Sequence, residues 1–357
     1  MSKKDNSNTK AGKISNGVKI FLIDGNSFCY RAFYAIRNLS TSRGEPTNAV
    51  YGFISMLRKI IKDEKPDYLG IAFDMKAPTF RHEKYDDYKA HRKPMPDSLI
   101  AQVPVIKEVV RAYNIPIFEK EGFEADDILA TIAKKMAEES LDVYIVTGDK
   151  DMLQLVGPRV RVYSQHKEGL VYDEEKVIER YGVPPEKIAD LIALMGDSSD
   201  NIPGVPGFGE KTAVSMMKDF KSLEDIIAKP EKIKQEARKK LLLHNVELAR
   251  LSRELAVLDD NVPLEIGLSD FRLKEPDAEK LLKLFKRFEF KKLIKEYTPE
   301  RSLDSRYHLV KDKNGLDGLI EELKKAGLFA FDFETTSADP MAARPIGISF
   351  SFKEGEA

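Results

Sequence analysis

The chain has 357 residues, of which 42% are hydrophobic and 33% charged, and its net charge at pH 7 is −1; this length predicts two or three domains, and the balanced charge gives no overall signature of nucleic-acid binding. Its single cysteine, Cys29, excludes an intramolecular disulfide and a thiolate zinc site and is typical of a reducing cytosol. No apolar run approaches the roughly 18–20 residues of a membrane span, so no membrane-spanning helix is expected.

The N-terminal residues 1–17 are polar and rich in lysine, serine and asparagine, and they lack the apolar core of a signal peptide. They predict a disordered tail. Residues 18–183 alternate short apolar runs with helical patterns, which predicts an α/β core with a mostly parallel sheet and flanking helices.

Three apolar runs of this core each end in an aspartate, and they span residues 18–24, 68–74 and 143–149. Because the carboxyl ends of parallel strands open onto one crevice, Asp24, Asp74 and Asp149 are expected to lie close together. A turn after a strand explains any one of them equally well.

The segment 76–93 follows the second strand and combines cations with aromatic residues. Its six lysines and arginines outnumber three acids, which leaves a net charge of about +3. Such a pattern suits phosphate contact and base stacking, although a solvated basic helix has the same composition. Its position next to the crevice favours contact with nucleic acid.

Further acidic residues come from three places along the chain. A helix is expected to begin at residues 122–127, Asp151 follows the third strand, and residues 196–201 form a polar string; together they supply Glu124, Asp126, Asp127, Asp151, Asp197 and Asp200. So many carboxylates in one crevice repel each other unless cations lie between them. Oxygen ligands without histidine or cysteine suit Mg²⁺ or Mn²⁺, and two such ions about 4 Å apart can hydrolyse a phosphodiester.

From residue 184 to about residue 300 the pattern predicts helices alone, as at 188–195, 210–220 and 277–297. Residues 202–213 are rich in glycine and proline and lie between two of these helices. They predict a hairpin whose backbone approaches phosphate, next to a helix N-terminus that favours anions. A plain connector is the alternative, and the glycine and lysine spacing does not match a P-loop.

A polar break at residues 298–307 precedes a second set of strands, at 328–334 and 346–350. Asp332 and Glu334 lie at the end of the first of these, as a strand-end acid pair or as part of a further metal site. The segment 301–357 is expected to be a linker and an incomplete domain without nuclease activity of its own.

The strings around Asp24, Glu124, Asp149 and Asp197, with Tyr88-Lys89-Ala90-His91-Arg92 and the hairpin, closely resemble the 5′ nuclease domain of bacterial DNA polymerase I, a relative of flap endonucleases. The resemblance covers about residues 18–300. Residues 331–335 resemble the first motif of the 3′→5′ exonuclease that follows it in these polymerases. The implied fold is a PIN-like core, a helix–three-turn–helix subdomain at 184–300 and the start of an RNase H-like domain.

The resemblance implies a 5′→3′ exonuclease and flap endonuclease that acts on nicked or branched duplex DNA with a 5′ flap or an RNA primer. It implies two or more Mg²⁺ ions, replaceable by Mn²⁺, held by Asp24, Asp74, Glu124, Asp126, Asp127, Asp149, Asp151, Asp197 and Asp200. Lys89 and Arg92 are the expected catalytic cations in a helical arch at about 81–98. The implied DNA contacts are Arg81, Tyr88, Lys89, Arg92, Gly204, Val205, Gly207, Gly209, Lys211 and Thr212, with a potassium ion on the hairpin carbonyls. The expected protein is a monomer of the bacterial cytoplasm, associated with the nucleoid.

Two other functions fit parts of the pattern. A catalytically silent DNA-binding scaffold would keep the basic segments but lose metal carboxylates, and none of the expected carboxylates is missing. A PIN-type ribonuclease toxin would be much shorter and would lack the hairpin at 202–213. The sequence therefore favours the structure-selective 5′ nuclease.

Overall fold

The computed structural model describes residues 17–164, 169–298, 306–337, 339 and 341–357. The chain divides into two compact units, one ending at Tyr297 and the other beginning at Thr298. The tail predicted at 1–17 lies outside the described residues except for Gly17. None of the described helices is long and apolar enough to cross a membrane.

A six-stranded sheet with the order β3-β2-β1-β4-β5-β6 is the centre of the first unit. The strands are β1 (Lys19–Asp24), β2 (Tyr68–Ala72), β3 (Ile117–Phe118), β4 (Asp142–Thr147), β5 (Val160–Ser164) and β6 (Val171–Tyr172). All neighbours pair in parallel except β6, which is antiparallel at one edge. The three predicted strands are confirmed, and β1 lies between β2 and β4, so the carboxyl ends of all three are adjacent.

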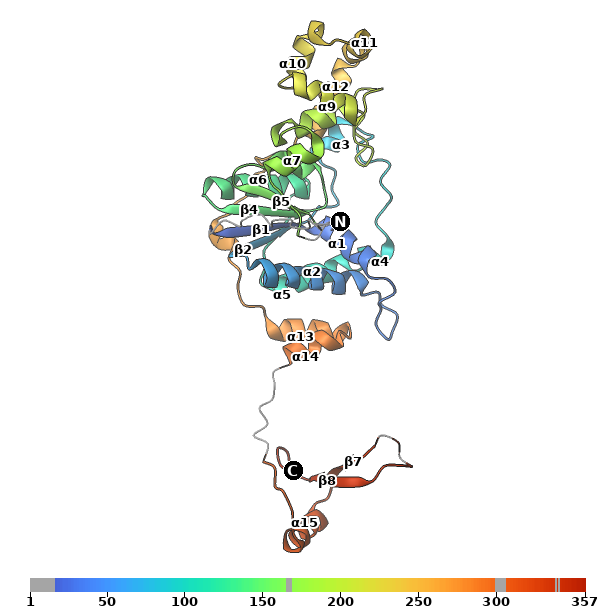
Figure 1. Cartoon of the computed structure of the whole chain (residues 1–357), viewed down its shortest axis with the longest axis vertical. Helices are drawn as coiled ribbons and strands as arrows, with labels where there is room; N and C mark the ends of the chain where they lie inside the picture. The colour runs from blue at the N-terminus through green and yellow to red at the C-terminus, as the bar shows by residue number, and fades with distance from the viewer. Residues whose placement is uncertain (1–16, 165–168, 299–305, 338, 340) are drawn as a thin grey trace, which may run out of the picture. The chain divides into compact units, whose positions relative to one another are not determined.

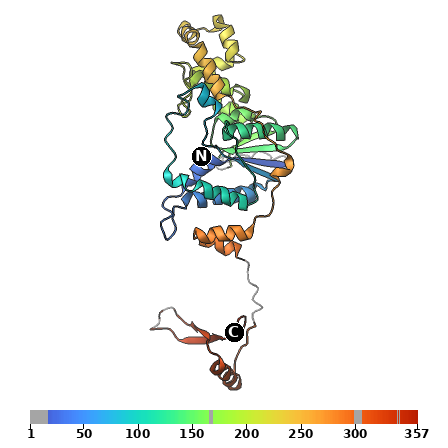
Figure 2. The same ribbon diagram turned by 180° about the vertical axis from the view of Figure 1, so that it is seen from behind.

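Successive side chains of β1 point to opposite faces of the sheet, and each face packs into a core of its own. Ile20 and Leu22 belong to one core, and Phe21 and Ile23 to the other. Helices α1 (Gly25–Ala35), α2 (Asn48–Glu64) and α5 (Val103–Ala112) cover the Phe21 face, while α6 (Ala125–Glu138) covers the Ile20 face (Figure 1). The same two layers are seen from behind in Figure 2.

The helices after residue 173 pack on both sides of the sheet, and the chain from residue 184 to residue 297 is helical as predicted. Helices α7 (Glu174–Tyr181), α8 (Ile188–Met195), α9 (Glu210–Asp219), α10 (Leu223–Ala228), α11 (Glu236–His244) and α12 (Val246–Ala256) extend the core on the α6 side. Helices α13 (Ala278–Arg287) and α14 (Lys291–Tyr297) join the opposite core, where Leu281 and Phe285 pack with residues of α5. Short 3-10 turns lie at η1 (Asp151–Leu155), η2 (Pro185–Lys187), η3 (Pro230–Lys232) and η4 (Leu268–Phe271).

The expected helical arch is helical only at its base. In the segment 81–98, α3 (Phe80–Lys84) and the start of α4 (Asp97–Ile100) are the helices, and the residues between them form turns. Lys89 has a positive φ of 57°, which a continuous helix excludes. Pro94 and Pro96 further disfavour helix here.

The second unit contains α15 (Lys313–Lys325) and an antiparallel pair of strands, β7 (Ala330–Thr335) and β8 (Pro345–Ser351). Both strands were predicted, and the helix was not. Phe331 and Phe333 of β7 are 58% and 53% exposed, so the described part of this unit leaves large apolar side chains uncovered.

Candidate metal centre and nucleic-acid interface

Acidic side chains gather where β1, β2 and β4 end. A cleft of about 510 Å³ is lined by Asp24, Asp74, Asp126, Asp149, Asp197 and Asp200. The fold brings these side chains together: Asp24, Asp74 and Asp149 lie at or just after the ends of adjacent parallel strands, and Asp126 lies in the first turn of α6. Asp197 and Asp200 arrive on the loop after α8, which places the late polar string beside the sheet.

Local hydrogen bonds hold the first of these carboxylates in place. The Asp24 carboxylate accepts a hydrogen bond from the Ser27 backbone N–H at 2.9 Å and caps α1. The Asp74 carboxylate accepts from the Asn26 side-chain amide at 2.7 Å and from the Ala125 backbone N–H at 2.7 Å. Asp74 therefore ties the start of α1 to the start of α6.

Three carboxylates at or beside the cleft, Asp24, Asp126 and Asp151, are poorly compensated as anions. Burial raises the pKa of Asp24 to about 7, with neighbouring Asp74 and Asp149 adding to the rise. Burial and neighbouring aspartates also raise the pKa of Asp126 and Asp151, and in each of these residues the buried Oδ1 atom has no hydrogen-bond partner among the described residues. Buried, unpartnered carboxylate oxygens without histidine or cysteine fit a hard divalent cation such as Mg²⁺ or Mn²⁺.

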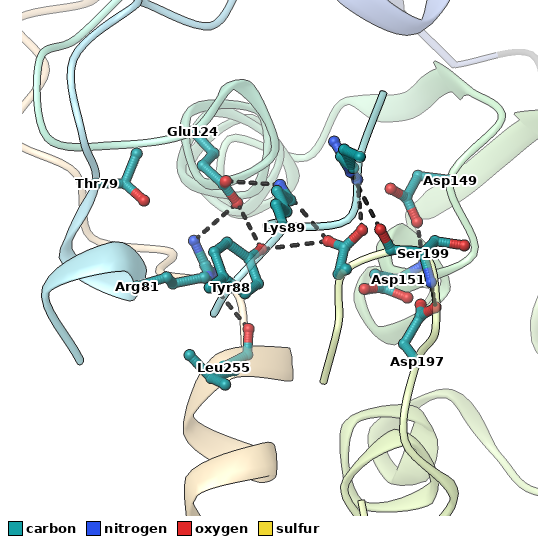
Figure 3. A network of polar contacts seen from close by, with 12 residues as sticks. Thr79, Arg81, Tyr88, Lys89, Glu124, Asp149, Asp151, Asp197, Ser199 and Leu255 are labelled. Atoms are coloured by element: carbon teal, nitrogen blue, oxygen red, sulfur yellow. Dashed lines mark hydrogen bonds and ion pairs between the residues drawn. The ribbon is translucent and has the colours of Figure 1, made fainter. Parts of the chain in front are cut away.

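Protein cations lie between several of the acidic groups in this structure (Figure 3). Lys89 Nζ is 2.6 Å from Glu124 Oε1 and 3.5 Å from Asp200 Oδ2, and Arg92 pairs with Asp200. Lys150 Nζ is 2.7 Å from Asp197 Oδ2. Within residues 17–357, apart from the gaps in the described ranges, no three acidic, histidine or cysteine side chains are placed to hold an ion as they stand.

The same cations set the charge of Asp200. Burial alone would raise the pKa of this carboxyl, but Lys89 and Arg92 outweigh burial and hold it below its ordinary value. Burial would likewise lower the pKa of the Lys89 ammonium, and Glu124 and Asp200 raise it instead. Asp200, Lys89 and Arg92 thus stabilise one another in their charged forms, unlike Asp24 and Asp126.

Arg81 does not lie where a DNA contact was expected. Its side chain is 1% exposed, and its guanidinium donates to both carboxylate oxygens of Asp127 at 2.7 Å each and to Glu124 at 3.2 Å. It also donates to the Leu255 and Val257 carbonyls, each at 2.9 Å. Arg81 therefore ties α3 to the start of α6 and the end of α12, and this role corrects the expectation of a phosphate contact.

The residues around Arg81 also differ from the roles expected of them as metal ligands or DNA contacts. Asp127 is fully buried and its oxygens also accept from the Glu124 and Asp259 backbone N–H groups, so it is no open metal ligand here. Tyr88 is 3% exposed, and its hydroxyl hydrogen-bonds to the carboxylates of Glu124 and Asp200. Its ring is therefore not available for base stacking. Glu124 binds Arg81, Tyr88 and Lys89 rather than facing the cleft.

Loss of the Arg81 guanidinium should destabilise the fold strongly. We expect Arg81→Met to lower the free energy of unfolding by about 3–5 kcal/mol, because it leaves the Asp127 charge buried without its partner. Lys84→Met, three residues away, removes only an exposed pair with Glu254 and should cost less than about 1 kcal/mol. Urea denaturation of the two variants measures the difference, and equal small losses would contradict the structural role of Arg81.

Several cleft residues were not assigned a role from the sequence, namely Asn26, Ser27, Tyr30, Met95, Lys150 and Ser199. A signal existed for two of them. Asn26 stands two residues after the end of the first strand, and Tyr30 follows it by four residues, which places both on one face of α1. Tyr30 is partly exposed, so it offers the cleft the aromatic ring that Tyr88 does not.

The loop between α8 and α9 has the hairpin form that its glycines predicted. Gly196, Gly204 and Gly207 have positive φ angles, and Asp197 and Ile202 form a bridge at its base. A Cβ on Gly204 would lie 2.3 Å from the Gly196 backbone nitrogen, so this glycine is required by packing alone. Val205 is buried in the core, so its side chain is not the expected DNA contact, whereas Gly207, Gly209 and Lys211 are exposed and Thr212 is partly exposed.

Comparison with known proteins agrees with this arrangement. A family model described as "5′-3′ exonuclease, N-terminal resolvase-like domain" matches residues 19–182, and one described as "5′-3′ exonuclease, C-terminal SAM fold" matches residues 183–279. A "3′-5′ exonuclease" model matches residues 307–357.

Two bacterial relatives match most of the chain. A 5′-3′ exonuclease of Aquifex aeolicus is 42% identical over 280 residues, which are 78% of this chain and 94% of the relative. DNA polymerase I of Bacillus caldotenax is 44% identical over 282 residues, 78% of this chain. The chain spans 32% of the length of that polymerase.

Solved structures share the fold. A T5 5′-exonuclease with bound zinc has a TM-score of 0.58 at 21% identity and covers 78% of this chain and 99% of its own. A T5 flap endonuclease in a pseudo-enzyme-product complex with DNA and metal ions has a TM-score of 0.56 at 20% identity, covering 78% of this chain and 97% of its own.

Proposed function

The chain belongs to the 5′-3′ exonuclease family, and from this premise we propose that it removes 5′ ends and flaps from duplex DNA, including RNA primers, by metal-assisted hydrolysis of the phosphodiester backbone. The observation that carries the proposal is the meeting of six aspartates in one cleft, with the base of the hairpin on the same loop as two of them. Cleavage and duplex binding are thereby brought together by the residues between α8 and α9.

Seven carboxylates remain as candidate ligands, namely Asp24, Asp74, Asp126, Asp149, Asp151, Asp197 and Asp200. Two Mg²⁺ or Mn²⁺ ions, when bound, would activate water and stabilise the leaving oxygen. Asp24, Asp126 and Asp151 have the strongest need for such ions, since burial raises the pKa of Asp24 to about 7 and an oxygen of each of the other two has no partner among the described residues.

Lys89 and Arg92 are proposed to bind the phosphate of the substrate. Both now neutralise Asp200, and both line the cleft beside the aspartates. With metal ions bound at the aspartates, Lys89 and Arg92 would be available to bind the phosphate of the 5′ strand and the charge that develops on it. Tyr30, on α1, is placed to stack on the adjacent base.

The hairpin between α8 and α9 grips the duplex without reading its sequence. Its exposed backbone at Gly207 and Gly209 can approach phosphate, and Lys211 and Thr212 lie in the first turn of α9, whose N-terminus favours anions. A potassium ion on the hairpin carbonyls would strengthen the contact. We further propose that the working unit is a monomer of the bacterial cytoplasm, associated with the nucleoid, and forms the nuclease part of a DNA polymerase I.

The second unit is proposed to contribute no nuclease activity by itself. Asp332 and Glu334 lie on β7, which is exposed along its length. Two acids on one strand supply too few ligands for a two-metal site. Digestion from a recessed 3′ end that Asp332→Ala abolishes would overturn this part of the proposal.

A labelled duplex with a 5′ flap tests the proposed activity directly. In Mg²⁺ the protein should release the flap, and it should leave a blunt duplex whose 5′ ends are blocked intact. Equal cleavage of a single strand without any duplex would contradict the structure selectivity, and no cleavage of any substrate would contradict the nuclease itself.

Gly209 allows a test of the hairpin contact that does not disturb the fold. A Cβ added there meets no atom within 4 Å, and its φ of −101° suits any residue. We expect Gly209→Ala to weaken binding of all duplex sequences several-fold, because the methyl group would stand between backbone and phosphate. Fluorescence anisotropy on two unrelated duplexes measures the change.

Gly267 provides the matched control for this substitution. It also caps a helical turn with an extended backbone, and its Cβ would meet no atom closer than 3.8 Å. Gly267→Ala should leave DNA affinity unchanged, although it replaces an N-cap glycine by alanine as Gly209→Ala does and should lower stability by a similar small amount. Equal affinities for both variants would remove Gly209 from the DNA interface.

A further inference from the structure

The segment 229–244, which contains η3 and α11, is strongly basic. It holds six cations and two acids, Lys229, Lys232, Lys234, Arg238, Lys239 and Lys240 against Glu231 and Glu236. Its net charge is therefore about +4, in a chain whose overall charge is −1. We call it the basic α11 segment.

Most of this positive charge is not used within the protein. Lys229 pairs with Asp225, and Lys239 Nζ lies 3.5 Å from Glu236 Oε1. The other four cations, Lys232, Lys234, Arg238 and Lys240, form no ion pair with any residue that the structure describes, and they are exposed or partly exposed. Four unpaired cations close together repel each other, so the segment carries a cost that a polyanion would remove.

The basic α11 segment lies beside the hairpin. A Cβ on Gly207 would be 3.4 Å from Leu241 Cδ1 of α11. Leu242, the next residue, is buried in the same core as Val205 and Phe208 of the hairpin. Leu241 thus places α11 next to Gly207 of the hairpin, while Leu242 packs into the core and the four unpaired cations of the segment stay exposed or partly exposed. Figure 1 shows α10, α11 and α12 beyond α9, at the end of the unit away from the sheet.

We propose that the basic α11 segment is a second phosphate-contact surface, which binds the duplex where it continues past the hairpin. This inference rests on the proposed function. DNA carries one charge per roughly 1.7 Å of its axis and stays straight over a few turns. A duplex held at Gly207 and Gly209 therefore presents further phosphates next to α11. Lysines and arginine without a paired acceptor bind such phosphates independently of sequence.

If the basic α11 segment binds DNA, the affinity of the protein for duplex should depend on duplex length and on salt concentration. Affinity should rise when the duplex beyond the hairpin is extended from roughly one helical turn, about 10 base pairs, to about three turns. The variant K232Q/K234Q/R238Q/K240Q should lose most of this gain. With the long duplex, its plot of log affinity against log salt should be shallower by roughly 2–4, because each lost phosphate contact accounts for about 0.9 of slope.

A matched variant controls for net charge. K286Q/K291Q/K292Q/K295Q removes four exposed lysines from α13 and α14, which belong to the opposite core. It should bind the long and the short duplex as the unchanged protein does. Thermal melting checks that both variants fold, and the α13/α14 variant should cleave a flap at the normal rate.

Each outcome separates the inference from the function on which it rests. Equal salt slopes for the two quadruple variants on the long duplex would overturn the α11 surface, as would an affinity of the unchanged protein that does not grow with duplex length. If Gly209→Ala weakens binding while the α11 variant does not, the hairpin stands and the second surface fails. If the unchanged protein neither binds nor cuts the flap duplex, the proposed function itself fails.

Discussion

Removal of divalent metal should abolish flap cleavage while leaving the protein folded. The candidate ligands are all carboxylates, and EDTA should take the ions from them without touching the protein's own ion pairs at Lys89, Arg92 and Lys150. Addition of excess Mg²⁺ or Mn²⁺ should restore the rate, because both are hard ions that bind oxygen ligands. The measurement is the initial rate on the labelled flap duplex before chelation, in EDTA and after re-addition. Cleavage at the original rate in EDTA would contradict the metal centre.

The same carboxylates predict how pH changes the stability of the metal-free protein. Burial raises the pKa of Asp24 from 3.8 to about 7, so the folded state holds this proton more tightly than the unfolded chain does. The free energy of unfolding in EDTA should therefore fall as pH rises from about 4 to about 7, and then level off. One pKa unit corresponds to about 1.4 kcal/mol, which makes the loss from Asp24 on the order of 4 kcal/mol.

Excess Mg²⁺ should oppose this fall, because the ions then neutralise the carboxylates that the lost protons leave charged. Asp200, whose pKa is lowered by Lys89 and Arg92 against the effect of burial, changes stability only below about pH 4 and does not disturb this window. Urea denaturation at several pH values, with Mg²⁺ and with EDTA, gives the two curves. Parallel curves between pH 4 and 8 would show that no ion binds at the cleft.

Replacement of Asp126 by asparagine should separate chemistry from stability. Asp126→Asn keeps the shape of the side chain but removes a charge that would bind metal. We expect cleavage to fall by at least roughly 10²–10³-fold, the range for losing one group that stabilises charge in a transition state. Duplex affinity should stay the same or rise, since a negative charge near the phosphates is lost.

The melting temperature in EDTA should rise in the same variant. Burial and the charges of Asp24 and Asp149 raise the pKa of Asp126, so its carboxylate opposes folding when no metal is present. Asp190→Asn is the contrasting control, because Asp190 is buried with Arg253 and the Leu223 N–H as partners. That control should lower the melting temperature and leave cleavage of the remaining folded protein unchanged. A lower melting temperature for Asp126→Asn in EDTA would contradict the account of the cleft.

Much of the fold and of the cleft followed from local sequence patterns. The runs that end at Asp24, Asp74 and Asp149 predicted parallel strands, and a parallel sheet brings such ends to one edge whatever the rest of the chain does. The acidic residues at the start of the helix that contains Asp126, and in the polar string that contains Asp197, were recognised in the same way, by residue type and spacing. Residues 202–213 predicted their hairpin, because positive φ angles at Gly204 and Gly207 need glycine.

The tertiary structure alone decided which charged and aromatic residues remain available for ligands. Arg81 and Tyr88 have the composition of a DNA-binding segment, yet their partners lie between 36 and 176 residues away, at Glu124, Asp127, Asp200, Leu255 and Val257. Burial of a side chain depends on those distant neighbours, which no local pattern contains. The same holds for Tyr30, which lines the cleft because α1 packs beside it, and for the cations near α11, which matter because Leu241 of that helix lies next to Gly207 of the hairpin. Local sequence determines where a chain can fold into strands, helices and turns, whereas long-range packing determines which of its polar groups stay free to act.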